Sequence, residues 1–329
     1  MSRFSPGQQL DSYQIQELLG AGAYAESYKA VDIRNGKTVV LKIPDPALFA
    51  DQGIFNRYRR EAEVARHLHH PSVQGGIDVQ DSRTEPYLVL EYVDGQPLRK
   101  KMQSHGGLLP TSTVIDWGTQ LARALAYLHS QGVVHRDLKP ENVLVTSDGR
   151  LVIADFGTAQ LEGARRLTWR HLSESLGTPD YMSPEQVQGE RGDARSDLYS
   201  WGVMMYEMLT GRVPFKGDNW MAVMAGHLSG DPKPIHKLRP DVPPGLEAVV
   251  GHAMRRYPEH RYQSAAELLA DLERVDKLDP SHYDTSPEKP MGGMAATEST
   301  KRLWAFVAMI AAIFAGIVAV IITLSVLLR

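Results

Sequence analysis

The sequence predicts an α+β domain followed by one C-terminal transmembrane helix. Short apolar segments, such as the β-branched run at 38–43, favour strands in the first hundred residues. Apolar residues recur every three or four positions from Thr111 onward, which is the spacing of a buried helix face. From Leu303 to Leu328 no residue is charged. A chain of 329 residues with ordinary composition is long enough to bury a sizeable core.

Composition excludes several classes of function. There are no cysteines, so disulfides, thiolate metal sites and cysteine nucleophiles are absent. A net charge of -3 lacks the basic excess of nucleic-acid-binding domains, and we expect no nucleic-acid partner. The N-terminus has no apolar run, so we expect no signal peptide.

The first elements are a strand that leads into a glycine turn, and a second, more apolar strand at 38–43. Tyr13 and Ile15 alternate with glutamines and lead into a turn that contains Gly20 and Gly22. Glycines let a backbone approach phosphate groups closely, although glycine pairs in turns are too common to identify a site alone. The strand at 38–43 carries a single lysine, Lys42, and a lysine in such apolar surroundings needs an anionic partner.

A third strand and a long helix follow. Residues 87–93 are predicted to form a buried strand that runs into a turn. The helix begins near Thr111 and can stop at Gly132, and its periodic apolar residues are assigned to the core without chemistry. These core residues are Val114, Trp117, Leu121, Leu125 and Leu128.

Two polar clusters then follow apolar runs, where polar side chains are least expected. Asp137, Lys139 and Asn142 lie in one loop after Val133 and Val134, and Asp155 follows the run 151–154. Buried polar groups of this kind need partners, so a purely structural role for all of them is unfavourable. Oxygen ligands such as these suit Mg²⁺ better than zinc.

The loop at 135–142 and the Asp155-Phe156-Gly157 segment resemble the catalytic loop and metal-binding segment of protein kinases. The whole stretch from 11 to about 275 is similar to the bacterial Hanks-type serine/threonine kinases. The resemblance implies a two-lobed kinase fold, with a β-rich N-lobe and a helical C-lobe. It also implies Mg-ATP-dependent phosphorylation of serine or threonine in protein substrates, with ATP and Mg²⁺ as cofactors.

The resemblance assigns a role to each polar residue. Asp137 would orient the attacking hydroxyl and Lys139 would steady the transferring phosphate, while Asn142 and Asp155 would hold Mg²⁺. Lys42 would hold the α- and β-phosphates and pair with Glu61, with Glu63 as the alternative partner. Leu90 would be the gatekeeper, and the backbone of Glu91 and Val93 would bond adenine. The residues assigned to the ATP site are Leu19, Gly20, Gly22, Ser27, Val40, Lys42, Glu61, Leu90, Glu91, Val93 and Leu144.

Three departures from the kinase pattern keep an alternative open. Ala25 replaces the third glycine of the glycine-rich loop, Ser27 replaces a valine and Val40 replaces an alanine. All three alter the nucleotide pocket, which is the feature expected of a pseudokinase that binds nucleotide and partners without phosphotransfer. A small-molecule phosphotransferase is disfavoured by the peptide-docking segment around Gly177 and Glu185.

The same resemblance predicts structural pairs and a regulatory loop. Glu185 should pair with Arg261, and Asp197 should brace the backbone of the catalytic loop. Arg136 should meet a phosphate on the activation loop, roughly 158–181. The candidates for autophosphorylation, in order of preference, are Thr168 and Ser173, then Ser175.

The C-terminal part lies outside the resemblance. We expect a lead at 1–10, the kinase domain at 11–275, a flexible juxtamembrane tether at 276–302 and a transmembrane helix at 303–328. Lys301 and Arg302 before the span place the kinase domain on the cytoplasmic side, with the C-terminus on the far side. Small residues of the span suggest homodimerisation through it. They are Ala311, Ala312, Ala315, Gly316 and Ala319.

Overall fold

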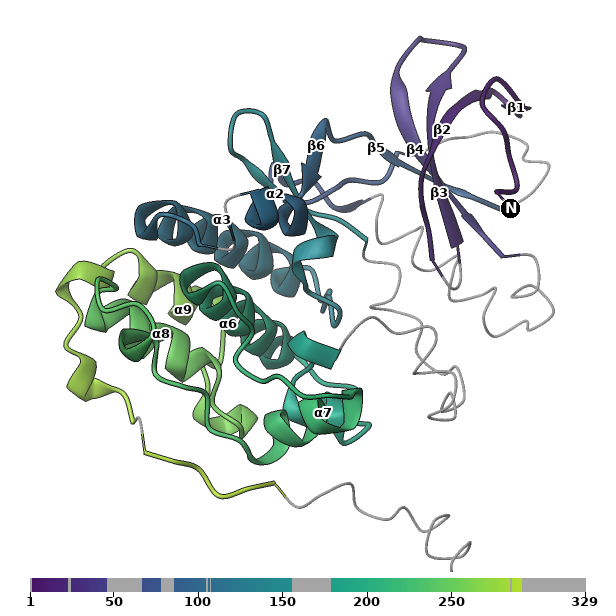
Figure 1. Ribbon diagram of the computed structural model, residues 1–329. Helices are drawn as coiled ribbons and strands as arrows, with labels where there is room; N and C mark the ends of the chain where they lie inside the picture. The colour runs from purple at the N-terminus through teal and green to yellow at the C-terminus, as the bar shows by residue number, and fades with distance from the viewer. Residues whose placement is uncertain are drawn as a thin grey trace, which may run out of the picture. The chain divides into compact units, whose positions relative to one another are not determined.

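The structure is a computed structural model that describes residues 2–22, 25–45, 67–77, 86–104, 106, 108–155, 179–284 and 286–291. Strands come first along the chain and most helices follow them, as the colours of Figure 1 show. Two separate hydrophobic clusters form the main cores, one within the N-terminal sheet and one among the helices. This arrangement confirms the α+β class and the two lobes that the sequence predicts.

The N-terminal lobe is a five-stranded antiparallel sheet whose strands lie side by side in chain order. They are β1 (Gln9–Leu10), β2 (Tyr13–Ala21), β3 (Ala25–Asp32), β4 (Thr38–Pro44) and β5 (Leu88–Glu91). One face carries the core, because Val39, Leu41 and Ile43 of β4 pack with Tyr28 of β3 and with other apolar side chains. The residues between them on β4, Val40 and Lys42, therefore point to the opposite face.

A second, three-stranded antiparallel sheet joins the two lobes along the chain. It consists of β6 (Gly95–Pro97), β7 (Val143–Thr146) and β8 (Leu151–Ile153), in that order. Gly95 is required at the start of β6, because a Cβ atom there would lie 2.9 Å from the carbonyl oxygen of Val145. This close approach lets the chain pair with β7 directly after it leaves β5.

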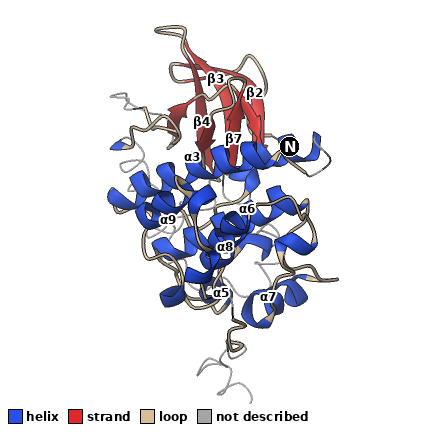
Figure 2. Ribbon diagram, turned by 90° about the vertical axis from the view of Figure 1, so that its left-hand side faces the viewer, coloured by secondary structure: helices blue, strands red, loops and turns tan. Residues whose placement is uncertain are grey.

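Helices form the C-terminal lobe, as Figure 2 shows in blue. The α-helices are α2 (Leu98–Ser104), α3 (Thr111–Ser130), α5 (Pro184–Val187), α6 (Ala194–Thr210), α7 (Trp220–Ser229), α8 (Pro244–Ala253) and α9 (Ala265–Leu272). The 3₁₀ turns are η2 (Pro140–Asn142), η4 (Pro179–Tyr181), η5 (Ile235–Lys237), η6 (Pro258–His260), η7 (Val275–Lys277) and η8 (Pro280–His282).

Helix α6 is the centre of this lobe, and its residues from 196 to 210 are all buried. The indole of Trp201 donates to the carbonyl of Gly118 on α3 at 3.0 Å. Gly118 permits this contact, since a Cβ atom there would lie 2.6 Å from the side chain of Met205. The predicted apolar stripe of α3 is buried in the same core, and Gly132 follows the helix end with a φ of 71°.

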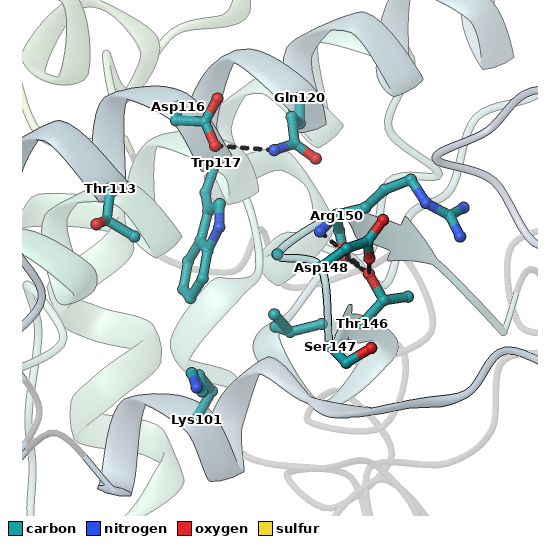
Figure 3. Close-up of a pocket in the computed structure, with 11 residues that line it drawn as sticks. Lys101, Thr113, Asp116, Trp117, Gln120, Thr146, Ser147, Asp148 and Arg150 are labelled. Atoms are coloured by element: carbon teal, nitrogen blue, oxygen red, sulfur yellow. Dashed lines mark hydrogen bonds between the residues drawn. The ribbon is translucent and has the colours of Figure 1, made fainter.

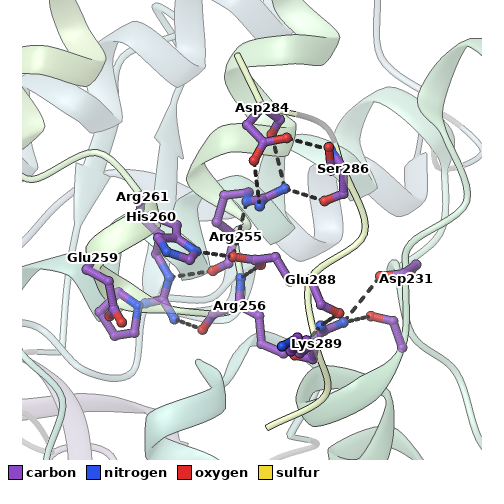
Figure 4. Close-up of polar contacts among 12 residues, drawn as sticks. Asp231, Arg255, Arg256, Glu259, His260, Arg261, Asp284, Ser286, Glu288 and Lys289 are labelled. Atoms are coloured by element: carbon purple, nitrogen blue, oxygen red, sulfur yellow. Dashed lines mark hydrogen bonds and ion pairs between the residues drawn. The ribbon is translucent and has the colours of Figure 1, made fainter.

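The C-terminal segment differs from the sequence expectation. Residues 276–302 were predicted as a flexible tether, but those from 276 to 284 and from 286 to 291 lie against the helical lobe. Arg255 and Arg256 bond this segment, Glu288 included, as Figure 4 shows. The amide of Met291 donates to the carbonyl of Leu228 at 2.9 Å, and the compact unit extends to Met291. The described part of the predicted tether is therefore packed on the helical lobe.

Within the described ranges, no helix is both long and apolar enough to cross a membrane. The predicted span at 303–328 and the rest of the predicted tether, 292–302, lie outside the described residues.

Candidate active site

One buried carboxylate, that of Asp197, fixes the backbone at the start of the loop at 135–142. Asp197, on the first turn of α6, accepts the backbone N–H of His135 at 2.8 Å and that of Arg136 at 2.7 Å. It also contacts the Nε2 atom of His129 at 2.8 Å. Arg136 has a φ of 64°, which a non-glycine residue adopts only when its surroundings enforce it. The prediction that Asp197 braces this backbone is confirmed.

The polar side chains of the loop form one hydrogen-bonded group. The ammonium of Lys139 donates to both carboxylate oxygens of Asp137, at 2.9 and 2.7 Å. The Nδ2 atom of Asn142 donates to the same side chain at 3.0 Å and to the carbonyl of Asp137 at 2.8 Å. All three residues are therefore brought together as the sequence predicts. The carboxylate of Asp137 stays partly exposed and faces two donors.

Strand β8 places the second aspartate beside this group. The N–H of Ala154 donates to the carbonyl of Asn142 at 2.9 Å, so Asp155 follows immediately at the edge of the loop. Asp155 has a φ of 61°, a second strained position in the same site. Its carboxylate accepts the ammonium of Lys42 at 2.6 Å, which joins the N-terminal sheet to the loop.

Several predicted partners lie outside the described residues. Glu61 and Glu63 are among them, so the pairing of Lys42 with Glu61 stays a prediction. Phe156, Gly157 and most of the predicted activation loop also lie outside the described residues. The three predicted phosphorylation sites, Thr168, Ser173 and Ser175, also lie outside.

The predicted ATP residues of the N-terminal sheet share one face. Lys42 lies opposite Ser27 on β3 and Leu88 on β5, and Val40 lies opposite Leu90. Side chains of directly opposite residues project to the same side of a sheet. Ser27, Val40 and Leu90 therefore stand on the face that carries Lys42, away from the core on the other side.

Leu144, on β7 directly after the loop at 135–142, is the predicted ATP-site residue of the second sheet. Val143 and Val145 point into the helical core, so Leu144 between them projects to the opposite side of β7. The backbone of Glu91 is bonded by neighbouring residues: its N–H donates to Gly75 at 2.9 Å, and its carbonyl accepts the side-chain amide of Gln74 at 2.8 Å.

The glycine turn lies at the ends of β2 and β3. Gly20 pairs with Ser27, and Leu19 lies at an irregularity of the β2–β3 register and is exposed. Gly22 lines a hollow of about 210 Å³. The hollow is also lined by Arg3, which precedes β1, and by residues at the ends of β2, β3 and β4. Residues 23 and 24, at the tip of the turn, lie outside the described residues.

The donor set fits a magnesium ion. Asn142 donates through its amide nitrogen, which leaves the amide oxygen as the atom that a cation would contact. The carboxylate of Asp155 is about half exposed and lies next to Asn142 along the backbone bonds of Ala154. Mg²⁺ prefers oxygen ligands and keeps waters and phosphate oxygens in its coordination sphere, so two protein ligands are sufficient.

The predicted pair of Glu185 and Arg261 is present and buried. Arg261 donates to the two carboxylate oxygens at 2.9 and 2.7 Å, and Ser196 donates to the same carboxylate at 2.6 Å. Burial opposes ionisation of Glu185, but the hydrogen bonds and charge of Arg261 outweigh it and lower the pKa of Glu185 below its usual range. This prediction is confirmed.

Sequence reasoning missed three polar residues around the site. Gln186 donates to the carbonyl of Arg136 at 2.9 Å and supports the strained loop. Arg99 bonds Glu141 and Glu207, each at 2.7 Å, directly below the loop. Gln74 bonds the carbonyl of Glu91 in the hinge, the name used for the segment 91–93 whose backbone the resemblance assigns to adenine. A glutamine or arginine on its own gives no pattern, so only the fold reveals these contacts.

A larger pocket lies apart from these residues. It has a volume of about 430 Å³ and lies between α2, α3 and the turn that joins β7 to β8 (Figure 3). Its lining residues are Lys101, Thr113, Asp116, Trp117, Gln120, Val145, Thr146, Ser147, Asp148, Gly149 and Arg150. None of the predicted site residues lines it, so the site follows from the motifs and their contacts rather than from pocket size.

The geometry defines the class of protein: a two-lobed kinase domain in which Lys42 reaches Asp155 beside the bonded group of Asp137. A family model described as "Protein kinase domain" matches residues 13–271, and the chain belongs to this family. It is similar to a probable serine/threonine-protein kinase of Streptomyces coelicolor, with 40% identity over 86% of this chain and 42% of that protein. It is also similar to serine/threonine-protein kinase PknB of Mycobacterium tuberculosis, with 36% identity over 87% of this chain and 45% of the relative.

Solved structures agree with this assignment. The crystal structure of the PknI kinase domain of Mycobacterium tuberculosis matches with a TM-score of 0.64 and 27% identity, over 83% of this chain and 99% of that chain. The chain spans less than half the length of the curated relatives that it matches. The prediction of a bacterial Hanks-type serine/threonine protein kinase is confirmed at the level of the family.

Proposed function

We propose that this protein transfers the γ-phosphoryl group of Mg-ATP to serine or threonine hydroxyls of proteins, itself included. One observation carries the proposal: Asp137, Lys139 and Asn142 form a single bonded group, and Lys42 reaches Asp155 beside it. These are the groups that positioning of a phosphoryl donor and an acceptor hydroxyl requires.

Each residue has a defined task in this reaction. The carboxylate of Asp137 orients the attacking hydroxyl and accepts its proton. Lys139 places a positive charge where the transferring group passes, and Lys42 fixes the phosphates of the donor. Asn142 and Asp155 would hold Mg²⁺, which supplies neutralisation of the phosphate charge when it is bound.

The membrane part of the proposal depends on the sequence of 303–328. An uncharged segment of this length, flanked by Lys301 and Arg302, is expected to anchor the kinase domain on the cytoplasmic side and to leave the C-terminus on the far side. Concentration at a surface favours phosphorylation of one copy by another, and packing of two spans would add to it. Release from membranes by alkaline carbonate would contradict the anchor, whereas release by detergent alone would support it.

The test of activity compares the full chain with its Asp137→Asn variant. Both are purified in detergent and incubated with Mg-ATP, and phosphate is mapped by mass spectrometry. We expect phosphate on Thr168, Ser173 or Ser175 in the unmodified chain, and a rate at least about 100-fold lower in the variant, because a positioned base contributes about 10²–10⁴-fold. Unfolding temperatures of the two proteins should agree, since the substitution preserves the shape of the side chain.

The alternative is a pseudokinase, and the residues Ser27 and Val40 favour it because they narrow or polarise the face that carries Lys42. Nucleotide binding without phosphate on either protein, and without transfer to a generic protein substrate, would make this alternative the better account.

A further inference from the structure

A short segment at 72–77 connects the two halves of the candidate site. On one side it pairs with β8: the N–H of Ile153 donates to Ser72, and the N–H of Gln74 donates back to Ile153, both at 2.9 Å. Ile153 lies two positions before Asp155. The backbone of Gln74 is therefore fixed by the same strand that places the metal-binding aspartate.

On the other side the segment pairs with the hinge strand β5. The N–H of Glu91 donates to Gly75 at 2.9 Å, and the N–H of Ile77 donates to Val89 at 2.8 Å. A Cβ atom at Gly75 would lie 3.1 Å from the carboxyl carbon of Glu91, so the glycine lets the segment lie this close to the hinge. Two backbone ladders thus fix the position from which the side chain of Gln74 projects.

The side chain of Gln74 is 6% exposed and reaches the hinge itself. Its amide nitrogen donates to the carbonyl oxygen of Glu91 at 2.8 Å. Burial of an amide costs folding free energy unless the amide is hydrogen-bonded, so this contact is a fixed part of the hinge structure. The family resemblance assigns the backbone of Glu91 to adenine, and the Glu91 carbonyl is the backbone atom that can accept the amino group of adenine.

A carbonyl oxygen has two lone pairs, so it can accept Gln74 and the amino group of a bound adenine together. Two donors that share one acceptor at about 2.9 Å lie roughly 4–5 Å apart. The amide of Gln74 is therefore a neighbour of the 6-substituent, and a relative shift of about 1–2 Å brings the two within hydrogen-bond distance. It presents a nitrogen donor or an oxygen acceptor, depending on its rotation about the last bond.

We propose that Gln74 reads the 6-substituent of the bound purine and lowers the discrimination between 6-amino and 6-oxo nucleotides. This rests on the proposed function, because it assumes that nucleotide binds at the hinge. A 6-oxo group directed at the Glu91 carbonyl alone would leave two acceptors facing each other. The nitrogen of Gln74 supplies the missing donor, whereas a 6-amino group donates to the Glu91 carbonyl and does not need Gln74.

The test measures dissociation constants of the full chain for the magnesium complexes of ATP and inosine triphosphate, which carries a 6-oxo group. Variants Gln74→Leu and Gln74→Glu remove the donor, the second while it keeps an acceptor and similar volume. We expect the dissociation constant for inosine triphosphate, divided by that for ATP, to rise by about 10-fold in both variants. This is the effect of one lost hydrogen bond. The nucleotides differ also at N1, but in the same way for every variant.

The control is Gln120→Leu, which removes an amide that accepts the N–H of Leu151 far from the hinge. Its ratio should equal that of the unmodified chain. Equal ratios in the unmodified chain and in a folded Gln74 variant would overturn the inference while ATP binding itself persists. If no protein binds either nucleotide, both this inference and the proposed function fail. Nucleotide binding without phosphotransfer would remove the proposed function alone.

Discussion

Two charge pairs of this protein differ in what surrounds them. Glu185 and Arg261 lie inside the helical lobe, with side chains 6% and 0% exposed. Lys42 and Asp155 lie at the candidate site, with side chains 14% and 48% exposed. Each pair joins segments far apart in sequence, and the nitrogen–oxygen distances are nearly equal, 2.7 Å for Glu185 with Arg261 and 2.6 Å for Lys42 with Asp155. Distance alone therefore does not distinguish a structural pair from a functional one.

The distinction lies in how completely the charges are satisfied. The carboxylate of Glu185 accepts three donated bonds, from Arg261 and Ser196, and none of these groups reaches solvent. Asp155 keeps about half of its side chain open, where an ion or a phosphate can replace a contact at little cost. A closed pair fixes the fold, and an open pair is available for binding.

The largest expected effect is on stability when the closed pair is broken. Glu185→Ala leaves Arg261 charged and buried, and removal of one partner of such a pair costs about 3–5 kcal/mol of unfolding free energy. Asp155→Asn removes a charge from the open pair but keeps an oxygen that accepts the ammonium of Lys42, and the Asp155 side chain is 48% exposed, so we expect a loss of about 1 kcal/mol or less. Urea unfolding of both variants against the unmodified chain measures the difference.

The comparison would fail if the two variants lost similar stability, or if Asp155→Asn were the less stable. The same Asp155→Asn protein should lose phosphotransfer while it keeps a cooperative urea transition, and the two results together show a folded protein that lacks a site residue. A loss of activity in both, with equal stability, would mean that Glu185 acts at the site rather than in the fold.

A second expected effect is a pH dependence of stability from a buried histidine. His227 of α7 packs against α6, where the hydroxyl of Tyr199 contacts its Nδ1 atom at 2.7 Å. Burial lowers the pKa of His227 to about 4. The unfolded chain binds the proton more readily, so stability is complete above about pH 6.5 and is lost as the pH falls toward 4. The loss reaches at most roughly 3 kcal/mol, from about 2.5 pKa units.

His227→Gln removes the titrating ring, and we expect a shallower fall in unfolding free energy between pH 6.5 and 4. His282→Gln, at an exposed position, is the control for loss of a histidine. An unchanged slope in the His227 variant would show that other groups dominate acid unfolding.

The polar group at 137–142 could be predicted from sequence because its members are close together in the chain. Asp137, Lys139 and Asn142 lie within six positions, and the structure brings them into one bonded group. The strands and the long helix were predictable for a similar reason, since the period of apolar residues reflects burial on one face. The pairs of Glu185 with Arg261 and of Asp197 with the loop needed the family resemblance, because no periodicity connects residues so far apart.

Other features could not be predicted because their partners lie elsewhere in the chain. Gln74 has no neighbouring pattern that indicates the Glu91 carbonyl. The segment before Met291 is rich in proline and charge, which favours a flexible tether when it is considered alone. Arg255 and Arg256 of the helical lobe bond its carbonyls and carboxylates, and only the fold brings these groups together.

The smallest expected effect concerns this docked segment, whose charges are intermediate between the two pairs. The side chain of Glu288 is 8% exposed, and it contacts Arg255 at 3.2 Å and His260 at 2.6 Å (Figure 4). Glu288→Ala should lower the unfolding free energy by about 1–2 kcal/mol, because it removes hydrogen bonds to charged groups that can regain water. Faster amide hydrogen exchange at 286–291 should accompany this change.

Glu273→Ala is the matched control, since Glu273 bonds Arg123 at 3.0 Å with both side chains about half exposed. This surface pair should contribute less than about 1 kcal/mol, and its removal should leave exchange at 286–291 unchanged. Equal exchange in the Glu288 variant and the control would mean that the Glu288 carboxylate is not needed, and that the amide of Met291 and the guanidinium groups of Arg255 and Arg256 hold the segment. Faster exchange restricted to the Glu288 variant would show that one buried carboxylate keeps the segment on the helical lobe.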